Sequence, residues 1–138
     1  MTTIAVKGKV MACDSRLAVG DRHYICNDKV VRIGDALVGA AGTANDIAKF
    51  ITWFEDKGEM PKVEDIDALV LDARGLWHYV NDCYGTRVIG GCWASGTGGQ
   101  AAHAAMLCGK TPEEAIRIAM KCDINTGGPV RVYNLKGE

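Results

Sequence analysis

The second residue of the chain, Thr2, could act as a catalytic nucleophile if it became the first residue. A small residue after Met1 permits removal of the initiator methionine, which would leave a threonine with a free α-amine. An α-amine has a pKa of about 7.7–8.0, so it can accept the hydroxyl proton near neutral pH. One residue would then supply both nucleophile and base, although many proteins begin Met-Thr by chance.

Three further residues could support such a nucleophile. Asp14 and Lys29 fall at the ends of expected strands, where an ion pair could place an ammonium group beside a hydroxyl and favour the alkoxide. A surface salt bridge is the commoner role for such a pair. Gly42 precedes an expected helix, where backbone N–H groups could face a developing oxyanion, although an ordinary turn glycine also fits.

Five segments in order resemble the proteasome β-subunit and HslV family across nearly the whole chain. They are TTIAVK, MACDSR, NDKVVRIGDALVGAAGTANDI, ASGTGGQAAHAAM and DINTGGPVRVY. They match the family's N-terminal Thr strand, its Asp-containing second strand, the strand with the catalytic Lys, the Gly-Ser-Gly-Gly loop and the Asp-x-x-Ser-Gly loop. Five matches at compatible separations are far more specific than any one of them.

The resemblance implies a role for each matching residue. Thr2 would be the nucleophile after removal of Met1, with Asp14 orienting Lys29 and with the Gly42 amide as oxyanion donor. Thr97, Asp123 and Thr126 would brace the N-terminal residue. The catalytic set is therefore Thr2, Asp14, Lys29, Gly42, Thr97, Asp123 and Thr126, and the substrate-binding set is Ala40, Ala41 and Gly42. Ala40 would form the floor of the S1 pocket, which predicts a preference for uncharged, medium to large apolar P1 residues.

Two features depart from the family pattern. Thr97 and Thr126 replace serines, which keeps both hydroxyls but adds a methyl group and restricts χ1. The chain is also shorter than typical members, with the deficit expected after Gly58, where the family continues into a second long helix. The resemblance therefore suggests a shortened bacterial or phage-type member.

The elements that would position these residues are mostly strands. We expect strands at 3–6, 9–13, 22–26, 30–33, 36–40, 68–72, 76–81, 86–89 and 130–135, and helices from Thr43 to about Gly58, at 98–107 and at 112–122. Few strand–helix alternations favour antiparallel sheets with helices outside them. The expected fold is α+β in one domain, residues 1–138. The resemblance makes it an Ntn-hydrolase αββα sandwich of two antiparallel sheets with a reduced outer helical layer.

Composition excludes several other classes of protein. The 138 residues are 48% apolar with a formal net charge of −1, which gives no footprint for nucleic acid or an anionic membrane. Without an apolar run long enough to span a bilayer or a signal peptide, we expect a cytoplasmic protein with reduced cysteines. The sequence predicts no cofactor and no metal site.

Three rival interpretations remain. Gly96-Thr-Gly-Gly-Gln-Ala101 fits a dinucleotide-binding pattern but lies too late for a further strand–helix unit. Ser15 and Ser95 lack the G-x-S-x-G context of a Ser–His–Asp hydrolase. The serious alternative is a catalytically silent ring or assembly subunit. The leading hypothesis is a threonine-type peptidase that acts on peptides or unfolded proteins. We expect it to form a homo-oligomeric ring, with two rings stacked as a double ring. The sequence leaves open whether an AAA+ ATPase unfoldase is a partner.

Overall fold

The computed structural model describes residues 2–81 and 84–136 of the chain. The strands of this part form two larger antiparallel sheets and a separate hairpin. In order across the larger sheet, its strands are β5 (Val30–Ile33), β6 (Ala36–Gly42), β7 (Ile66–Asp72), β8 (Gly75–Val80) and β9 (Thr86–Val88). The four-stranded sheet has the order β10 (Cys92–Gly96), β1 (Thr3–Lys7), β2 (Val10–Cys13) and β11 (Arg131–Asn134).

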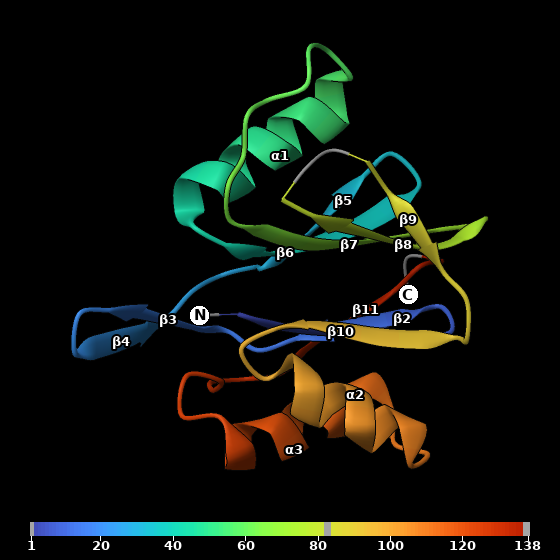
Figure 1. The fold of residues 1–138 in the computed structure, drawn as a ribbon. Helices are drawn as coiled ribbons and strands as arrows, with labels where there is room; N and C mark the ends of the chain where they lie inside the picture. Colours follow the sequence, from blue (N-terminus) through green and yellow to red (C-terminus); the bar gives the residue numbers. More distant parts are fainter. Residues whose placement is uncertain (1, 82–83, 137–138) are drawn as a thin grey trace.

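The two sheets lie face to face, and helices cover their outer faces (Figure 1). Helix α1 (Ala44–Asp56) packs on the five-stranded sheet, and α2 (Gly99–Leu107) and α3 (Pro112–Cys122) pack on the four-stranded sheet. Antiparallel sheets with external helices confirm the predicted α+β class.

Alternation along β1 explains how the four-stranded sheet contributes to two cores. Ile4 and Val6 point between the sheets and pack with residues such as Leu37 and Leu69 of the opposite sheet. Ala5 points the other way, into a core rich in alanine beneath α2 and α3. Because successive side chains of a strand face opposite sides, one short strand can serve both layers.

Helix α1 is capped at Thr43, where the sequence predicts its start. The Thr43 hydroxyl accepts the Asp46 N–H at 3.3 Å, as a helix N-cap does. The Thr43 N–H donates to the Asp65 carbonyl at 3.3 Å, and Asp46 lies in the first turn of the helix. The Asp46 carboxylate accepts the N–H groups of Glu64 and Asp65 at 3.0 and 2.9 Å, and these bonds hold the segment before β7 beside the start of the helix.

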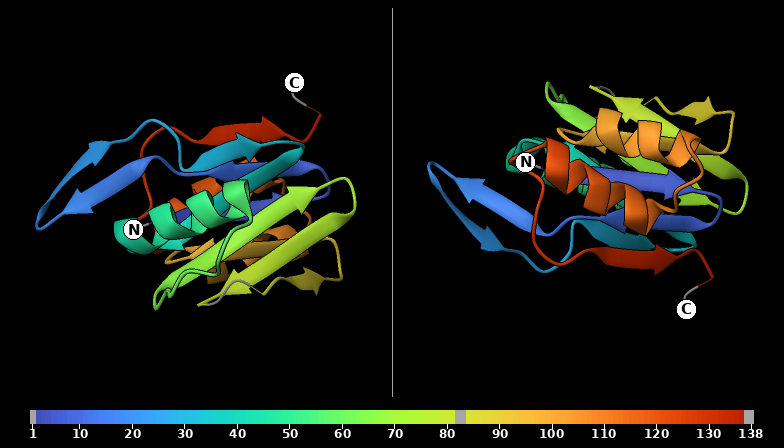
Figure 2. Two further views of the ribbon diagram at one scale, coloured as in Figure 1. Left: turned by 90° about the horizontal axis from the view of Figure 1, so that it is seen from above. Right: turned by 90° about the horizontal axis from the view of Figure 1, so that it is seen from below.

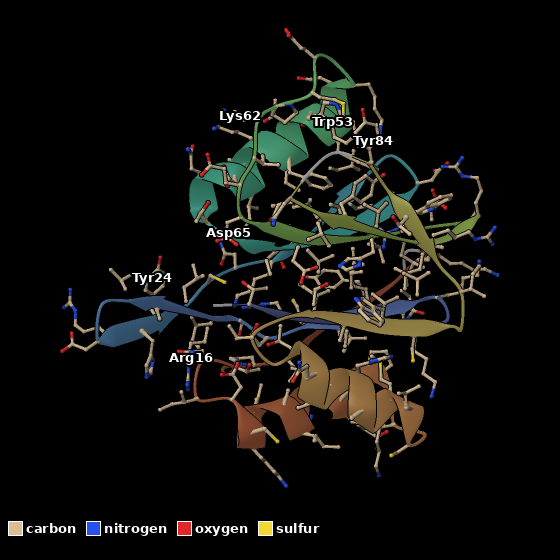
Figure 3. The ribbon with its side chains drawn as sticks, viewed as in Figure 1. Arg16, Tyr24, Trp53, Lys62, Asp65 and Tyr84 are labelled. Atoms are coloured by element: carbon tan, nitrogen blue, oxygen red, sulfur yellow. The ribbon has the colours of Figure 1, made fainter. Side chains whose placement is uncertain are left out.

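The remaining strands, β3 (Arg16–Val19) and β4 (Arg22–Ile25), form a hairpin that projects from the body of the molecule (Figures 1 and 2). The sequence predicts a strand at β4 but none at β3. Figure 3 shows Arg16 at its base, directed toward the loop after α3, where it donates to the Ile124 carbonyl at 3.1 Å. Val19, Tyr24 and Ile25 of this hairpin are exposed.

None of the helices in the described ranges, 2–81 and 84–136, has the length and apolar character needed to cross a bilayer.

The core beneath α1 depends on one aromatic side chain, and this gives a stability prediction. Phe50 is fully buried, and its ring lies 5.1 Å from Tyr79 and 5.9 Å from Trp53, measured between ring centroids. We expect Phe50→Ala to lower the free energy of unfolding by about 3–5 kcal/mol, because truncation leaves a cavity that the sheet cannot fill. Chemical denaturation measures this directly. Leu107→Ala is the matched control, since Leu107 is 67% exposed, and should change stability by less than about 0.5 kcal/mol. Similar losses in both variants would contradict the assignment.

Candidate active site

Thr2 lies just before β1, at the edge of a cavity of about 400 Å³. The cavity is lined by Thr2, Ala41, Gly42, Asp65, Asp67, Gly96 and Thr97. Thr2 is 7% exposed, and its carbonyl accepts the Thr97 N–H at 3.1 Å. Three residues of the predicted catalytic set, Thr2, Gly42 and Thr97, therefore lie around one space. Met1, whose removal the hypothesis requires, is outside the described residues.

The predicted pair of Asp14 and Lys29 forms an ion pair in the protein interior. The Lys29 ammonium donates to Asp14 Oδ1 at 2.9 Å and to the Arg16 carbonyl at 2.5 Å. The two side chains are 5% and 0% exposed, so this is not a surface salt bridge. Asp14 Oδ1 also accepts the Thr3 N–H at 3.0 Å, and Oδ2 accepts the Gly127 N–H at 3.1 Å. A buried carboxylate needs such partners, because an unpaired buried charge is very costly.

The second predicted group, Thr97, Asp123 and Thr126, also comes together. Both threonine hydroxyls donate to Asp123 Oδ2 at 2.6 Å, and the Asn125 N–H donates to Oδ1 at 3.1 Å. Desolvation alone would raise the pKa of Asp123. These hydrogen bonds outweigh it, and the pKa of the carboxyl lies below its ordinary value. Thr97 and Thr126 therefore both make the hydroxyl contacts expected at positions where the resemblance implies serine.

Thr3 joins the two groups, a role that the sequence analysis missed. Its N–H donates to Asp14 Oδ1, and its side-chain Oγ1 lies 2.8 Å from the Oγ1 of Thr126. Its oxygen also accepts the Gly98 N–H at 3.0 Å. Because Thr126 donates to a carboxylate, Thr3 is the donor to Thr126. The signal in the sequence was a threonine, Thr3, at a buried position of the mostly apolar strand β1.

Two glycines at the cavity have backbone requirements that other residues could not meet. Gly42 has φ of +138°, and a Cβ there would lie 2.1 Å from the Asp65 carbonyl oxygen. Gly96, which the sequence analysis did not single out as a site residue, has φ of +95°, and a Cβ would lie 1.6 Å from the Thr2 carbonyl oxygen. Close approach of β10 to Thr2 therefore depends on Gly96.

The structure places Ala40 outside this cavity, and its role at the floor of the S1 pocket stays a prediction. Ala40 is 4% exposed and packs with Phe50 and Ala68 in the core beneath α1. Alternation along β6 turns the next side chain, Ala41, toward Thr2. Of the predicted substrate-binding residues, Ala41 and Gly42 line the cavity. Two carboxylates that the sequence analysis missed, Asp65 and Asp67, line it as well.

The geometry counts against two rival interpretations. A dinucleotide site needs parallel strand–helix–strand units, whereas β10, before the glycine-rich turn, runs antiparallel to β1. Ser95, Asp67 and His78 do meet, but the Ser95 hydroxyl and the His78 ring both contact Asp67 Oδ1, at 2.8 and 2.6 Å. Serine therefore bonds to the carboxylate instead of to histidine, unlike a serine-hydrolase triad.

The lowered pKa of Asp123 predicts a pH-dependent contribution to stability. A carboxyl whose folded pKa is depressed stabilises the fold above its unfolded pKa, about 3.9, and loses that contribution as pH falls through the folded value. We expect Asp123→Asn to be less stable than the wild type by about 1 kcal/mol at pH 7, with the difference shrinking below about pH 4. Denaturation at several pH values measures it, with Asp21→Asn in an exposed turn as control. A difference that stays constant down to pH 2 would show that the charge of Asp123 plays no part.

Comparisons with known proteins agree with this arrangement at the level of fold. No protein-family model matches the chain, and no curated protein sequence matches it. Among solved structures, Thiobacillus denitrificans BPH superposes with a TM-score of 0.72 at 18% identity, over 98% of this chain and 98% of that chain. The same protein in complex with epoxomicin gives the same TM-score and identity, over 98% and 99%.

Eukaryotic HslV from Trypanosoma brucei superposes with a TM-score of 0.69 at 20% identity, over 97% of this chain and 99% of that chain. These alignments span almost all of each neighbour and do not confirm the shortening expected after Gly58. Identities of 18–20% establish similarity of fold alone. The chain therefore has the α+β fold of HslV-type, proteasome-like chains.

Proposed function

We propose that the chain is a threonine-type endopeptidase of the Ntn-hydrolase class, active after removal of Met1. The observation that carries the proposal is the position of Thr2. It lies at a cavity with Gly42, while the Asp14–Lys29 pair and the Asp123 group hold the adjoining Thr3. In this proposal the layers of Figure 1 are those of an αββα sandwich with one helix, α1, on the thinner side.

The proposed reaction uses Thr2 in two roles. Its free α-amine takes the hydroxyl proton as Oγ1 attacks the scissile carbonyl, and the Gly42 N–H stabilises the oxyanion. The protonated amine then gives its proton to the leaving amine, and the acyl group stays on Thr2 as an ester. Water, activated by the same amine, hydrolyses the ester and frees the enzyme.

Lys29 would act electrostatically in this scheme. Its ammonium is fixed by Asp14 and by the Arg16 carbonyl, so no reorganisation is needed when negative charge develops nearby. A positive charge favours the alkoxide over the neutral hydroxyl and keeps the α-amine in its neutral, basic form. The Thr97, Asp123 and Thr126 group would brace the amino end of the chain.

We further propose that the chain works in a homo-oligomeric ring, arranged as a double ring, in the cytoplasm. An unguarded threonine nucleophile in an open cleft would cleave any unfolded chain it met, and a ring limits access to peptides and unfolded proteins that can enter. Identical copies close by cyclic symmetry, and two facing rings add two-fold axes. An AAA+ unfoldase is the partner that such a chamber would need for folded substrates.

The first test of the proposal is the nucleophile. We expect Thr2→Ala to reduce peptide hydrolysis to background, because it removes the attacking oxygen, while the native mass of the assembly stays unchanged. In the wild type, a β-lactone or an epoxyketone should add its mass to the Thr2 terminus only. A catalytically silent ring subunit would form no adduct. Undiminished hydrolysis by Thr2→Ala would refute the mechanism.

The second test concerns Lys29. We expect Lys29→Ala to lower kcat by roughly 10²-fold, and Lys29→Arg not to restore it, since a planar guanidinium does not fit a site made for a compact ammonium. Rates are normalised to the folded fraction by circular dichroism, because loss of Lys29 leaves the buried Asp14 carboxylate without its counter-charge. Lys49→Ala, with a side chain 45% exposed, is the control. Near-normal rates in Lys29→Arg would reduce Lys29 to a structural partner of Asp14.

A further inference from the structure

The wall of the Thr2 cavity opposite the four-stranded sheet carries an acidic side chain that the proposed mechanism does not use. Asp67 lies near the start of β7 and points between the sheets, because its neighbours Ile66 and Ala68 point toward α1. Its side chain is 39% exposed, and the residue lines the cavity with Thr2. A substrate held at Thr2 would therefore meet this carboxylate.

Two neighbours hold the Asp67 carboxylate in place. The Ser95 hydroxyl, from β10 of the opposite sheet, donates to Oδ1 at 2.8 Å, and Ser95 is 1% exposed. His78 Nε2 lies 2.6 Å from the same oxygen, and the His78 ring packs near Trp93 with centroids 5.6 Å apart and planes tilted by 49°. Desolvation would raise the pKa of Asp67, but the contacts with His78, Ser95 and the Gly96 N–H outweigh it and lower the pKa. The group is therefore an anion at neutral pH.

The charge of the cavity is negative. Asp65 contributes a second carboxylate, and Figure 3 shows it at the same end of the five-stranded sheet as the start of the chain. Among the described residues that line the cavity, none is lysine or arginine. A cleft lined by charge of one sign concentrates substrates of the opposite sign. This character differs from the apolar preference expected from Ala40, whose methyl group lies beneath α1.

We propose that Asp67 selects substrates with a lysine or arginine side chain beside the scissile bond, and that Ser95 holds its carboxylate in position. The inference rests on the proposed peptidase function, since it needs a substrate bound at Thr2. A cationic side chain entering the cavity would pair with Asp67 Oδ2, on the side of the carboxylate away from the contacts with Ser95 and His78. Asp65 would strengthen this attraction from the rim of the cavity.

The Ser95–Asp67 hydrogen bond joins the two sheets and would also serve a purely structural role. The test therefore measures selectivity as well as rate. Peptides that differ only in Lys, Arg, Leu or Glu on either side of the scissile bond are compared with the assembled, processed wild-type protein. We expect kcat/KM to be highest for Lys or Arg and lowest for Glu, with the preference weakening as salt increases. The position at which it occurs identifies the side of the bond that enters the cavity.

Asp67→Asn keeps the shape of the side chain and removes its charge. We expect the ratio of kcat/KM for basic over apolar peptides to fall about tenfold, whereas a structural role would lower both values together. Ser95→Ala should lower the ratio by a smaller factor through loss of positioning. Asp72→Asn, at the other end of β7 and bonded to Arg74, is the control and should leave the ratio unchanged.

The wild-type measurement alone can overturn the inference, even if a variant does not fold. Equal or faster cleavage beside Leu than beside Lys and Arg would refute selection by Asp67 and leave the peptidase proposal standing. Failure to cleave any peptide, with no adduct at Thr2, would refute both. A selectivity ratio that is the same in Asp67→Asn and the wild type would show that Asp67 does not select the substrate.

Discussion

The fully buried carboxylate of Asp14 is the constraint on which the arrangement of this site depends. A charge removed from water must be matched by donors, and here three chain segments supply them: the Thr3 N–H, the Lys29 ammonium and the Gly127 N–H. These donors lie at the start of β1, just before β5 and just before β11. Satisfying one carboxylate therefore fixes the amino end of the chain relative to both sheets.

Much of this fold could be predicted from sequence, because β1, β2 and β6 are short apolar runs ended by turns and because α1 and α3 have clear caps. The Thr111 cap forms the full reciprocal box with Glu114, at 3.1 and 2.9 Å. β3 and β10 were missed for physical reasons. β3 is a projecting strand without a buried face. β10, with the sequence CWASG, has small residues at every position except Trp93, and its strand state is imposed by pairing with β1.

The site likewise contains residues that the sequence predicts and residues that only the structure reveals. Ordered motifs predicted Thr2, Asp14, Lys29, Gly42, Thr97, Asp123 and Thr126, and the structure groups them around the start of β1. What sequence could not provide was the face of each strand at the cavity. Successive residues of a strand face opposite sides, which is why Ala41 lines the cavity beside Thr2 and Ala40 does not. Asp67 and Ser95 carry no motif and become neighbours only when the two sheets pack.

The space between the sheets changes character along its length, and this change explains where chemistry can occur. At one end, Val6, Leu71 and Leu76 exclude water and hold the sheets together. At the other end the same two faces carry Asp67 and Ser95, which bond to each other across the gap, and Asp67 also contacts His78 of its own sheet. Polar groups in that position weaken the core, and here they lie beside Gly42 and Gly96, whose missing side chains let the backbone come close to Asp65 and Thr2. A cavity at this end therefore combines a rigid apolar support with a polar wall, the combination that a positioned nucleophile requires.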